Sequence, residues 1–351
     1  MTYDQKQIRV MITGAGSGVG QGILKCLRLS DLDLHIIAAD INWLQPAFYR
    51  AEEAVLIPRV EQLVEPDEII SLLNLNRVDI LLIGSEFEVL FFSQHRAQIE
   101  AKTNCCIVVS CSETIKLSND KYLTAKFLTE NNIAPSKFWA PKSLEEALTI
   151  YEEFGASLIL KPRQGTSNRG VHVISKPEDL VKHFDTIKGP MLQELLAGPT
   201  PDLDMEYTCS FFRDAEGKFF GPFTARRTLK NGASWVVEVD EFEAPAEMLM
   251  QIAKHIDVVG SFNVQLMMTP RGAVPFEFNC RFSGTTAVRA SFGFNEPEMA
   301  IRSFLLRQSL SLPKIRKGVA FRYLEEVFIE GAKATDLGAI FAGDGQIRRW
   351  F

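Results

Sequence analysis

Three polar side chains occur at alternate positions of one apolar segment. Glu277, Asn279 and Arg281 are separated by single apolar residues in the run Phe-Glu-Phe-Asn-Cys-Arg-Phe. Because successive side chains of a β-strand point to opposite faces, these three are predicted to share one face. Carboxylate and amide oxygens suit Mg²⁺, which completes its shell with phosphates and water, and Arg281 is positioned to meet a phosphoryl group. The pattern indicates a magnesium and phosphate centre, although such a motif on its own is more often a solvated ion pair.

A turn signal precedes this strand. Thr-Pro-Arg-Gly at positions 269–272 separates two apolar-rich runs, so residues 263–284 are predicted to form a β-hairpin. Pro275 is tolerated only near the start of the second strand, because proline cannot donate a ladder hydrogen bond. Gln265 on the first strand offers a further oxygen ligand. The hairpin is therefore the element expected to position the metal site.

The hairpin sequence is similar to that of a known superfamily. Asn-Val-Gln, followed by Glu-Phe-Asn-Cys-Arg-Phe-Ser-Gly, resembles the metal-binding hairpin of ATP-grasp enzymes, particularly the branch similar to the large subunit of carbamoyl-phosphate synthetase. The resemblance covers roughly residues 118–310 and implies that Arg281 acts catalytically on the transferred phosphoryl group. Cys280 stands where the superfamily usually has proline, a departure that changes no ligand. The metal ligands that the resemblance implies are Gln265, Glu277 and Asn279.

The N-terminal part of the chain alternates between predicted strands and helices. Apolar runs at 8–12, 36–39 and 78–83 are predicted to be buried strands, and a glycine-rich turn at 13–20 leads into a helix. Alternation of this kind favours an α/β fold with a doubly wound parallel sheet. We find no chemical motif in the C-terminal part. The predicted organisation is a Rossmann-like pre-ATP-grasp domain at 1–112, an α+β ATP-grasp domain with two subdomains at 113–312 (lid at about 122–195) and a C-terminal extension at 313–351.

The glycine-rich turn supports a second hypothesis. The pattern at 13–20 resembles the fingerprint of short-chain dehydrogenases, Asp40 ends the next predicted strand, and Tyr122-x-x-x-Lys126 matches their catalytic pair. Backbone N–H groups at a helix N-terminus can bind the pyrophosphate of NAD. An NAD-dependent dehydrogenase is therefore an alternative, but it leaves the hairpin motif at Glu277 unexplained. A non-catalytic protein that binds Mg-nucleotide is a further alternative.

A basic strand end and a flexible loop suggest phosphate binding. The strand at 157–163 is followed by glycines and hydroxyl residues at 164–170, whose backbone N–H groups can face phosphate oxygens beside the point charge of Lys161. Alone, such a loop is more ordinarily a hairpin turn, but before the metal hairpin it resembles the ATP-grasp phosphate loop. The ATP contacts that the resemblance implies are Lys121, Lys161, Arg163, Gly165, Ser167, Gly170, Glu194, Leu195, Leu196, Glu206 and Gln265.

The ribose contact within this set has more than one candidate. Glu206 matches the carboxylate that holds the ribose hydroxyls in the superfamily, and Asp202 and Asp204 stay open as alternatives. Adenine is expected beside the backbone near Glu194.

Substrate contacts are predicted from three further segments. Glu86 follows a strand end, where open α/β sheets bind ligands, although it also suits a helix N-terminus. Arg227 and Lys230 can neutralise a substrate carboxylate or acyl phosphate, and the resemblance favours Arg227 in a catalytic role. Ser283 and Gly284 begin a helix whose amides and hydroxyls would face the phosphoryl-transfer centre.

Composition excludes several classes of protein. The 351 residues are 46% hydrophobic and 23% charged, with a formal charge of −6, so the chain lacks the basic balance of a nucleic-acid-binding protein or of one bound to an anionic membrane. Its start is no signal peptide and it has no membrane-length apolar run, which predicts a cytoplasmic protein. Its six cysteines include no Cys-x-x-Cys pair, so zinc is not expected.

These observations predict an ATP-dependent ligase. The resemblance implies that Mg-ATP, or Mn²⁺ in place of Mg²⁺, phosphorylates a carboxylate to an acyl phosphate, which an amine or another nucleophile attacks to give ADP, phosphate and a C–N (amide) bond. The expected partners are small-molecule carboxylate and amine substrates, with an amino acid as the favoured carboxylate, and a second copy of the chain in a homodimer.

Overall fold

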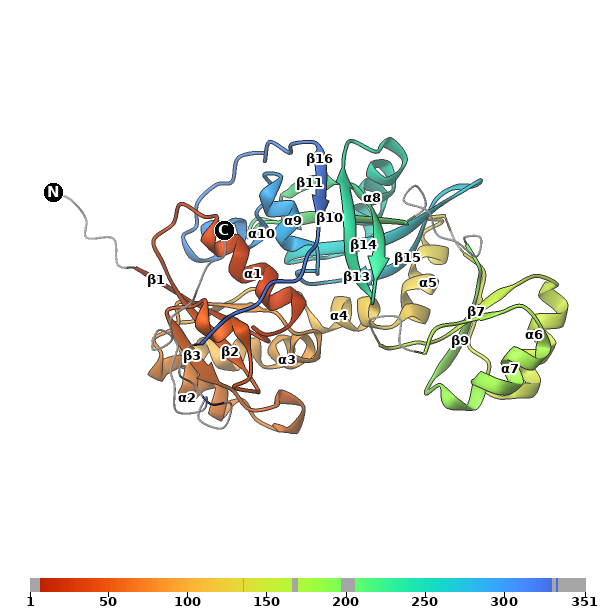
Figure 1. Ribbon diagram of the computed structural model, residues 1–351, viewed down its shortest axis with the longest axis horizontal. Helices are drawn as coiled ribbons and strands as arrows, with labels where there is room; N and C mark the ends of the chain where they lie inside the picture. The colour runs from red at the N-terminus through yellow and green to blue at the C-terminus, as the bar shows by residue number, and fades with distance from the viewer. Residues whose placement is uncertain (1–6, 135, 166–169, 197–205, 330–332, 334–351) are drawn as a thin grey trace.

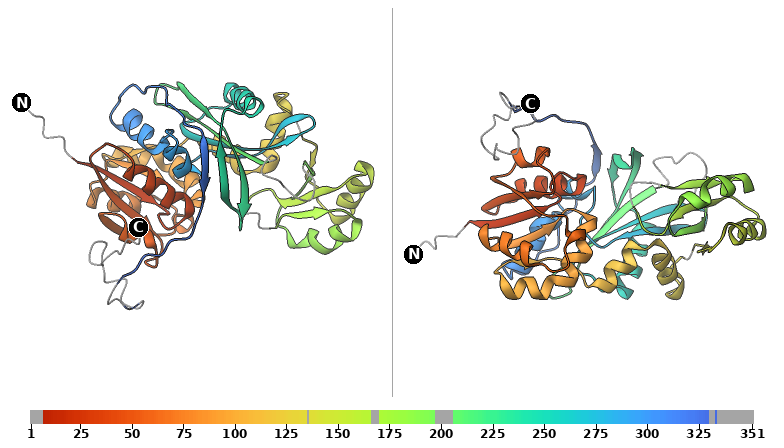
Figure 2. Two further views of the ribbon diagram at one scale, coloured as in Figure 1. Left: turned by 45° about the horizontal axis from the view of Figure 1, so that its top comes forward. Right: turned by 90° about the horizontal axis from the view of Figure 1, so that it is seen from below.

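Three sheets make up the part of the chain that the structure describes. The computed structural model describes residues 7–134, 136–165, 170–196, 206–329 and 333. An N-terminal parallel sheet, a central antiparallel sheet and a smaller lid sheet follow one another along the long axis (Figure 1). The central sheet lies between the other two in every view (Figure 2).

The N-terminal sheet is parallel, as predicted. Its five strands have the order β3-β2-β1-β4-β5, and alternate residues of β1 enter different cores: Val10 and Ile12 one, Met11 the other. Both faces are thus covered, as is usual for parallel sheets. Its description as Rossmann-like stays a prediction. The elements are β1 (Ile8–Thr13), α1 (Gly18–Arg28), β2 (Leu34–Asp40), β3 (Glu53–Leu56), α2 (Asp67–Leu75), β4 (Ile80–Ile83), α3 (Glu86–Lys102), β5 (Cys106–Ile107) and α4 (Ser112–Asn119).

The glycine-rich turn packs backbone against backbone between β1 and α1. A Cβ on Gly20 would lie 2.2 Å from the carbonyl oxygen of Gly14, and one on Gly84 would lie 2.7 Å from the Cα of Gly20. Ser17 caps α1 by accepting from the Gly20 N–H at 2.9 Å, and its hydroxyl donates to the Gly84 carbonyl at 2.8 Å. Asp40 accepts from the Gly16 N–H at 2.8 Å. The glycines therefore have a packing role that requires no dinucleotide.

Substitution of Gly20 should separate this packing role from simple helix propensity. Gly20→Ala is expected to lower the free energy of unfolding by about 1–3 kcal/mol, because its methyl group must displace the backbone of the turn. Gly18→Ala is the matched control, since a Cβ there meets nothing within 4 Å, and it should change stability by less than about 1 kcal/mol. Urea unfolding followed by circular dichroism measures both, and equal losses would contradict the packing role.

The lid is a four-stranded antiparallel sheet in the order β6-β9-β7-β8. Leu158, Leu160 and Leu192 pack with Ala147 of α6 and Leu180 of α7 in a core of its own. Helix α5 (Lys121–Glu130) falls within the range predicted for the lid but packs against β15 of the central sheet. The lid elements are β6 (Phe138–Trp139), α6 (Leu144–Phe154), β7 (Leu158–Pro162), β8 (His172–Ile174), α7 (Pro177–His183), η3 (Phe184–Thr186) and β9 (Pro190–Glu194).

The central sheet has seven antiparallel strands in the order β15-β14-β10-β12-β13-β16, with β11 beside β10. Phe211, Phe262 and Phe278 fill its core, with ring centroids 5.2 Å apart in each successive pair. Its elements are β10 (Glu206–Arg213), β11 (Phe219–Phe223), β12 (Ala225–Lys230), β13 (Ala233–Val239), α8 (Glu243–His255), β14 (Gly260–Thr269), β15 (Gly272–Asn279) and β16 (Gly318–Phe321).

The predicted hairpin is confirmed. Strands β14 and β15 pair across Thr269 and Gly272, and Gln265 lies opposite Glu277. A bulge shifts the register beside Gln265, where Pro275 lies opposite Leu266. Because β15 is an edge strand of the sheet, the missing N–H of Pro275 leaves no neighbouring strand without its partner.

Helices α9 (Thr286–Ser291) and α10 (Glu296–Ala300), followed by the π-helical turn η4 (Ile301–Leu305), join the hairpin to the N-terminal domain. Both helices pack against α1 (Figure 1), and the Asn295 side chain donates to the Cys26 carbonyl at 2.9 Å. One hydrophobic cluster spans both domains. Among the described residues, no helix has the length and apolar character needed to cross a membrane.

Candidate active site

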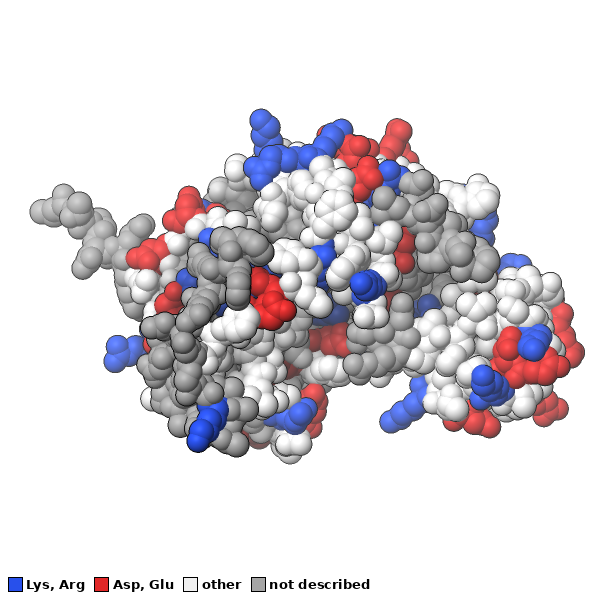
Figure 3. All heavy atoms as spheres, in the orientation of Figure 1, with Lys and Arg blue, Asp and Glu red and all other residues white. Residues whose placement is uncertain are grey.

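A cavity of about 1030 Å³ is lined by residues of all three sheets. The lid contributes β7 and β9, the central sheet contributes β10, β12, β14 and β15, and the N-terminal domain contributes its β1–α1 and β4–α3 turns. A notch between the lid and the rest of the molecule is visible on the surface (Figure 3). The cavity therefore lies where three separate parts of the chain meet.

The predicted metal residues lie together on the hairpin, inside this cavity. Oε1 of Glu277 accepts from the side-chain amides of Gln265 at 3.1 Å and Asn279 at 3.3 Å. Among the described residues, no group of three or more His, Cys, Asp or Glu could hold a metal ion. One carboxylate with neighbouring amide oxygens nevertheless fits Mg²⁺, which takes few carboxylates and relies on phosphates and water for the rest of its shell.

A buried arginine connects the metal residues to the expected ribose acid. Arg227 donates to Oε1 of Glu206 at 2.7 and 3.0 Å, to Oε1 of Gln265 at 2.9 Å and to Ser234 at 2.9 Å. These bonds turn the Gln265 amide so that its oxygen faces Arg227 and its nitrogen faces Glu277. In this arrangement Gln265 supports the carboxylate, and Arg227, predicted to contact substrate, is held by protein groups.

Lys161 is the most deeply buried cation of the lid side of the cavity. Its Nζ donates to Oε1 of Gln193 at 2.6 Å, and the Gln193 amide donates to Ser136 at 2.6 Å. Burial lowers the pKa of the Lys161 ammonium to about 8; the charge of Lys121 lowers it further, whereas that of Glu277 raises it. The group therefore carries its charge near neutral pH but titrates just above it.

Arg281 and Glu86 form an ion pair between the hairpin and the N-terminal domain. Nη2 of Arg281 donates to Oε2 of Glu86 at 2.8 Å, across 195 positions of sequence, and Nη1 donates to the Phe282 carbonyl at 2.9 Å. Both side chains are largely buried and line the cavity. The two residues predicted from separate motifs are thus brought together, each as the partner of the other.

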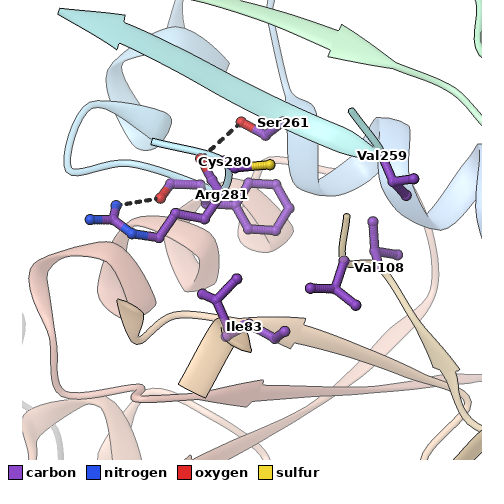
Figure 4. Close-up of a pocket in the computed structure, with 9 residues that line it drawn as sticks. Ile83, Val108, Val259, Ser261, Cys280 and Arg281 are labelled. Carbon is purple, nitrogen blue, oxygen red and sulfur yellow. Dashed lines mark hydrogen bonds between the residues drawn. The ribbon is translucent and has the colours of Figure 1, made fainter. Parts of the chain in front are cut away.

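Apolar side chains support the end of the hairpin. Figure 4 shows Ile83 below Arg281, and Val108 and Val259 to one side of Cys280. These side chains line a space of about 20 Å³. This volume is that of about one water molecule, so we regard it as a packing defect and not as a ligand site.

Cys280, which stands in place of the usual proline, is a buried packing residue. Its thiol donates to the Ser110 hydroxyl at 3.0 Å, and burial raises the pKa of the thiol to about 12. The side chain points away from the polar face of β15, as the period-two pattern predicted.

Sequence analysis did not find the ion pair beneath the cavity. Arg289 and Glu296 are both fully buried and joined at 2.7 Å. Arg289 also donates to the hydroxyls of Ser283 at 2.9 Å, Thr285 at 2.7 Å and Thr286 at 3.0 Å. These bonds fix the turn that follows the hairpin. A charged residue among Ala, Val and Ser was the one available signal in the sequence.

The oxygens of Glu296 are also satisfied from the central sheet. Ser210 and Ser261 donate to its Oε1 at 2.6 and 2.7 Å. The predicted substrate residues Ser283 and Gly284 both line the cavity, and Ser283 also accepts a hydrogen bond from Arg289.

Several predicted nucleotide residues line the cavity. They include Glu194, whose Oε1 accepts from Arg271 at 2.7 Å, and Lys121, whose Nζ donates to the Gly165 carbonyl at 2.6 Å. The predicted nucleotide residues that line the cavity are Lys121, Lys161, Gly165, Glu194, Leu195, Leu196, Glu206 and Gln265.

Two predicted cations point elsewhere. Arg163 is paired with Asp120 at 2.6 Å and lies over the Tyr122 ring, and it does not line the cavity. Lys230 is exposed and lies over the Trp235 ring, with its Nζ 4.4 Å from the ring centroid. Their aromatic and acidic neighbours account for both charges.

The remaining predicted residues are not part of this arrangement. Gly170 has a φ of +70° beside the loop but is not among the lining residues. Ser167, Asp202 and Asp204 lie outside the described residues.

The pair proposed for a dehydrogenase is not assembled. Tyr122 packs edge-on against Phe138 with centroids 5.2 Å apart, and Lys126 lies 3.6 Å from Glu130 on the exposed side of α5. Neither lines the cavity, and Asp40 accepts hydrogen bonds from its own turn. The fingerprint of the turn and the Tyr-x-x-x-Lys pair therefore belong to different parts of the fold.

The C-terminal extension, in which the sequence shows no chemical motif, reaches the cavity. Arg322, which follows β16, lines the cavity, and its Nη2 donates to the Gly284 carbonyl at 2.5 Å. Strand β16 ends at Phe321, one residue before Arg322.

Comparisons of sequence extend these observations. Residues 191–327 match the family described as ATP-grasp in the biosynthetic pathway with Ter operon. Formate-dependent phosphoribosylglycinamide formyltransferase of Francisella tularensis subsp. holarctica is 23% identical over 229 residues, 61% of this chain and 53% of that protein. The arginine-specific large chain of carbamoyl phosphate synthase of Neurospora crassa is 23% identical over 312 residues, 80% of this chain and 26% of its own length. The chain spans about half the length of the first of these relatives.

Solved structures share the fold. N5-carboxyaminoimidazole synthetase from Staphylococcus aureus, solved with ADP, has a TM-score of 0.68 and 15% identity, covering 89% of this chain and 81% of that one. Biotin carboxylase from Campylobacter jejuni, solved with a β,γ-ATP ligand, has a TM-score of 0.70 and 17% identity, covering 89% and 74%. These structures show that the chain shares the fold of ATP-grasp ligases, and the match to an ATP-grasp family covers residues 191–327.

Proposed function

We propose that the chain is an ATP-dependent ligase that forms a C–N bond between a small carboxylate and an amine, through an acyl phosphate. One observation carries the proposal. The hairpin row of Glu277, Asn279 and Arg281 lines the same cavity as Lys121 and Lys161. A site for hard cations thus shares its cavity with a pair of ammonium groups, which is the arrangement needed to hold the phosphates of a nucleotide.

The nucleotide would lie between the lid and the central sheet. Lys121 and Lys161 would bind its phosphates, Glu206 its ribose, and the backbone at 194–196 its adenine. Glu277 and Asn279 would hold Mg²⁺, which would supply positive charge to neutralise the phosphates. Structures that share this fold were solved with ADP and with MgADP, which supports this assignment.

The side chains of the site contribute by position and charge. Arg281 would contact the transferring phosphoryl group, with Glu86 orienting its guanidinium through their ion pair at 2.8 Å. Stabilising the charge that develops on a transferring group, and aligning the reactants, are the main contributions of such sites. No side-chain nucleophile is required. The name of the Francisella relative, a formate-dependent formyltransferase acting on a glycinamide, supports a small carboxylate and an amine as substrates.

The relatives and structures named above give the dehydrogenase hypothesis no support. The homodimer stays part of the proposal, and a biotin carboxylase domain that shares the fold was solved as a dimer with MgADP.

Thermal melting with nucleotides tests the proposal. At about 100 times its dissociation constant, Mg-ADP should add roughly 2.7 kcal/mol of stability, which raises Tm by several degrees. Excess chelator should weaken this shift. Phosphate release from ATP is then measured over panels of carboxylates and amines. A shift with NAD⁺ alone would contradict the proposal, and Mg-ADP binding without turnover on any pair would favour the non-catalytic alternative.

The titration of Lys161 predicts how the site responds to pH. Because its pKa is about 8, kcat/KM for ATP should fall about tenfold per pH unit above that value, as the ammonium that binds phosphate loses its proton. Lys161→Met should lower kcat/KM about 10- to 100-fold below pH 8, through loss of a charged hydrogen bond, and should remove the alkaline fall. The same fall in the variant would assign it to another group.

The stability of the free protein should change with pH in the opposite direction. The pKa of Lys161 in the folded state lies below its ordinary value of 10.5. Between these two pKa values the unfolded chain therefore binds more protons than the folded protein. The free energy of unfolding attributable to this group therefore rises between about pH 8 and pH 10.5. Comparison of wild type with Lys161→Met isolates this contribution.

A further inference from the structure

Arg322 enters the cavity from the edge of the central sheet. Strand β16 pairs antiparallel with β13, and the Arg322 N–H donates to the Trp235 carbonyl at 2.8 Å, which continues the ladder by one residue. Because side chains alternate along a strand, Arg322 shares a face with Ala320, which packs on the core, whereas Val319 and Phe321 are exposed. The strand thus directs the guanidinium inward.

The charge of Arg322 lacks the acidic partner that the other arginines of the cavity have. Arg227 is paired with Glu206 and Arg281 with Glu86. Arg322 donates from Nη2 to the Gly284 carbonyl, and within the described ranges no carboxylate forms an ion pair with it. Burial and the nearby charge of Arg227 lower the pKa of its guanidinium. A half-buried, uncompensated charge of this kind is costly unless a ligand pairs with it.

The position of Arg322 separates it from the expected phosphate site. Strand β16 lies beside the N-terminal domain, whereas β7 and β9, which carry the phosphate-side lysine and its glutamine partner, lie in the lid across the central sheet (Figures 1 and 2). Gly284, to which Arg322 donates, lines the same cavity as the β1–α1 turn at Ser17 and Gly18. A small substrate reaching from Arg281 toward the N-terminal domain would meet this guanidinium.

A guanidinium presents a planar set of donors that matches a carboxylate. The only side-chain hydrogen bond of Arg322 to another described residue is the one from Nη2. Its Nε and Nη1 are therefore available to a ligand. The Gly284 carbonyl beside Nη2 fixes the side chain in this orientation. An anion bound there would be neutralised by a charge that no acidic side chain in the described part of the chain pairs with.

We propose that Arg322 binds a carboxylate of the substrate other than the one that is activated, so that either the amine is an amino acid or the activated acid is a dicarboxylate. This inference rests on the proposed function, because it assigns Arg281 and the hairpin to the activated group. It makes the C-terminal extension part of substrate recognition.

The test uses thermal melting of the full chain saturated with Mg-ADP, with and without added anions. The panel contains L-amino acids, succinate and glutarate as dicarboxylates, acetate as a monocarboxylate and inorganic phosphate. The proteins are wild type, Arg322→Gln, Arg322→Lys and Arg316→Gln. Arg316 is the matched control, because it lies in the same extension, is exposed and does not line the cavity.

At least one amino acid or dicarboxylate, but not acetate, should raise the Tm of wild type and of Arg316→Gln. Arg322→Gln should keep the Mg-ADP shift and bind that ligand about 10- to 100-fold more weakly, as expected for loss of a charged hydrogen bond. Arg322→Lys keeps the positive charge without the planar set of donors, so its affinity for that ligand should fall less. Should Arg322→Gln fail to fold, the comparison of Arg322→Lys with wild type gives the same test.

Four outcomes overturn the inference. In the first, Mg-ADP shifts wild type but no member of the panel adds to it, which leaves the proposed function standing. In the second, the carboxylate shift is unchanged in Arg322→Gln. In the third, only inorganic phosphate responds to the substitution, which assigns the subsite to a phosphate group. In the fourth, Mg-ADP itself fails to shift wild type, which overturns the proposed function as well.

Discussion

Glu277→Ala is expected to lower ATP-dependent phosphate release at least about 100-fold, because it removes the carboxylate of the hairpin row. Oε1 of Glu277 is the shared acceptor of Gln265 and Asn279, so the variant loses both the charge that would hold Mg²⁺ and the bonds that orient its neighbours. The measurement is phosphate release at saturating Mg-ATP, together with the Tm shift produced by Mg-ADP. Both should fall, while the Tm without nucleotide changes little.

Glu247→Ala is the matched control for this variant. Glu247 lies on the exposed side of α8 in the same domain and does not line the cavity, so its loss should leave phosphate release within about twofold. If Glu277→Ala keeps wild-type turnover and nucleotide binding, the hairpin is not the metal site. If a high concentration of Mg²⁺ restores the turnover of Glu277→Ala, the defect of the variant lies in its affinity for the metal.

Glu296→Ala should lower the free energy of unfolding by about 3–5 kcal/mol, since it leaves the fully buried Arg289 without its counter-ion. The hydroxyls of Ser210 and Ser261 also lose their bonds to Glu296 and keep only the backbone carbonyls of Phe262 and Arg281 as acceptors. Chemical unfolding measures the effect. The change should extend to the active site, because Arg289 holds the turn at 283–286 through its bonds to the Ser283 and Thr285 hydroxyls.

Glu298→Ala is the control that compares the loss of a partly exposed ion pair with the loss of the buried pair. Glu298 lies two positions further along and pairs with Arg302 at 2.7 Å, but this pair is of the i,i+4 type and partly exposed. Its loss should cost about 1 kcal/mol or less. Similar losses for the two variants would show that the Arg289–Glu296 pair contributes no more than a surface pair, contrary to our expectation.

The shared face of the hairpin's polar residues was predictable from the sequence because it depends on local geometry. A strand places residues of period two on one face, so Glu277, Asn279 and Arg281 had to lie together once the turn at 269–272 closed the hairpin. The parallel N-terminal sheet was predictable for a similar reason, since its strands and helices alternate along the chain. Lys161 followed from its place at a strand end before a glycine-rich loop.

The partners of these residues were decided by the tertiary structure. Arg281 meets Glu86 across 195 positions. Arg227, whose contact with substrate stays a prediction, lines the cavity and joins Glu206 to Gln265. Sequence spacing carries no information about which strand of a sheet lies beside another. The free energy of an ion pair depends on that proximity and on burial, so motifs alone could identify the charged residues but not their roles.

Arg322 and Arg289 show the same limit most clearly. The sequence around Arg322 has no motif, and its role follows from an edge pairing between β16 and β13 that only the folded sheet creates. Arg289 lies in a short helix that would be unremarkable on a surface, and its burial opposite Glu296 comes from the packing of α9 and α10 on the central sheet and α1. The sequence by itself determined the polar row of the hairpin and the alternation of the N-terminal domain, because both depend on local repeats. The tertiary structure decided which charges are paired and which face the cavity, because those contacts join strands that are distant along the chain.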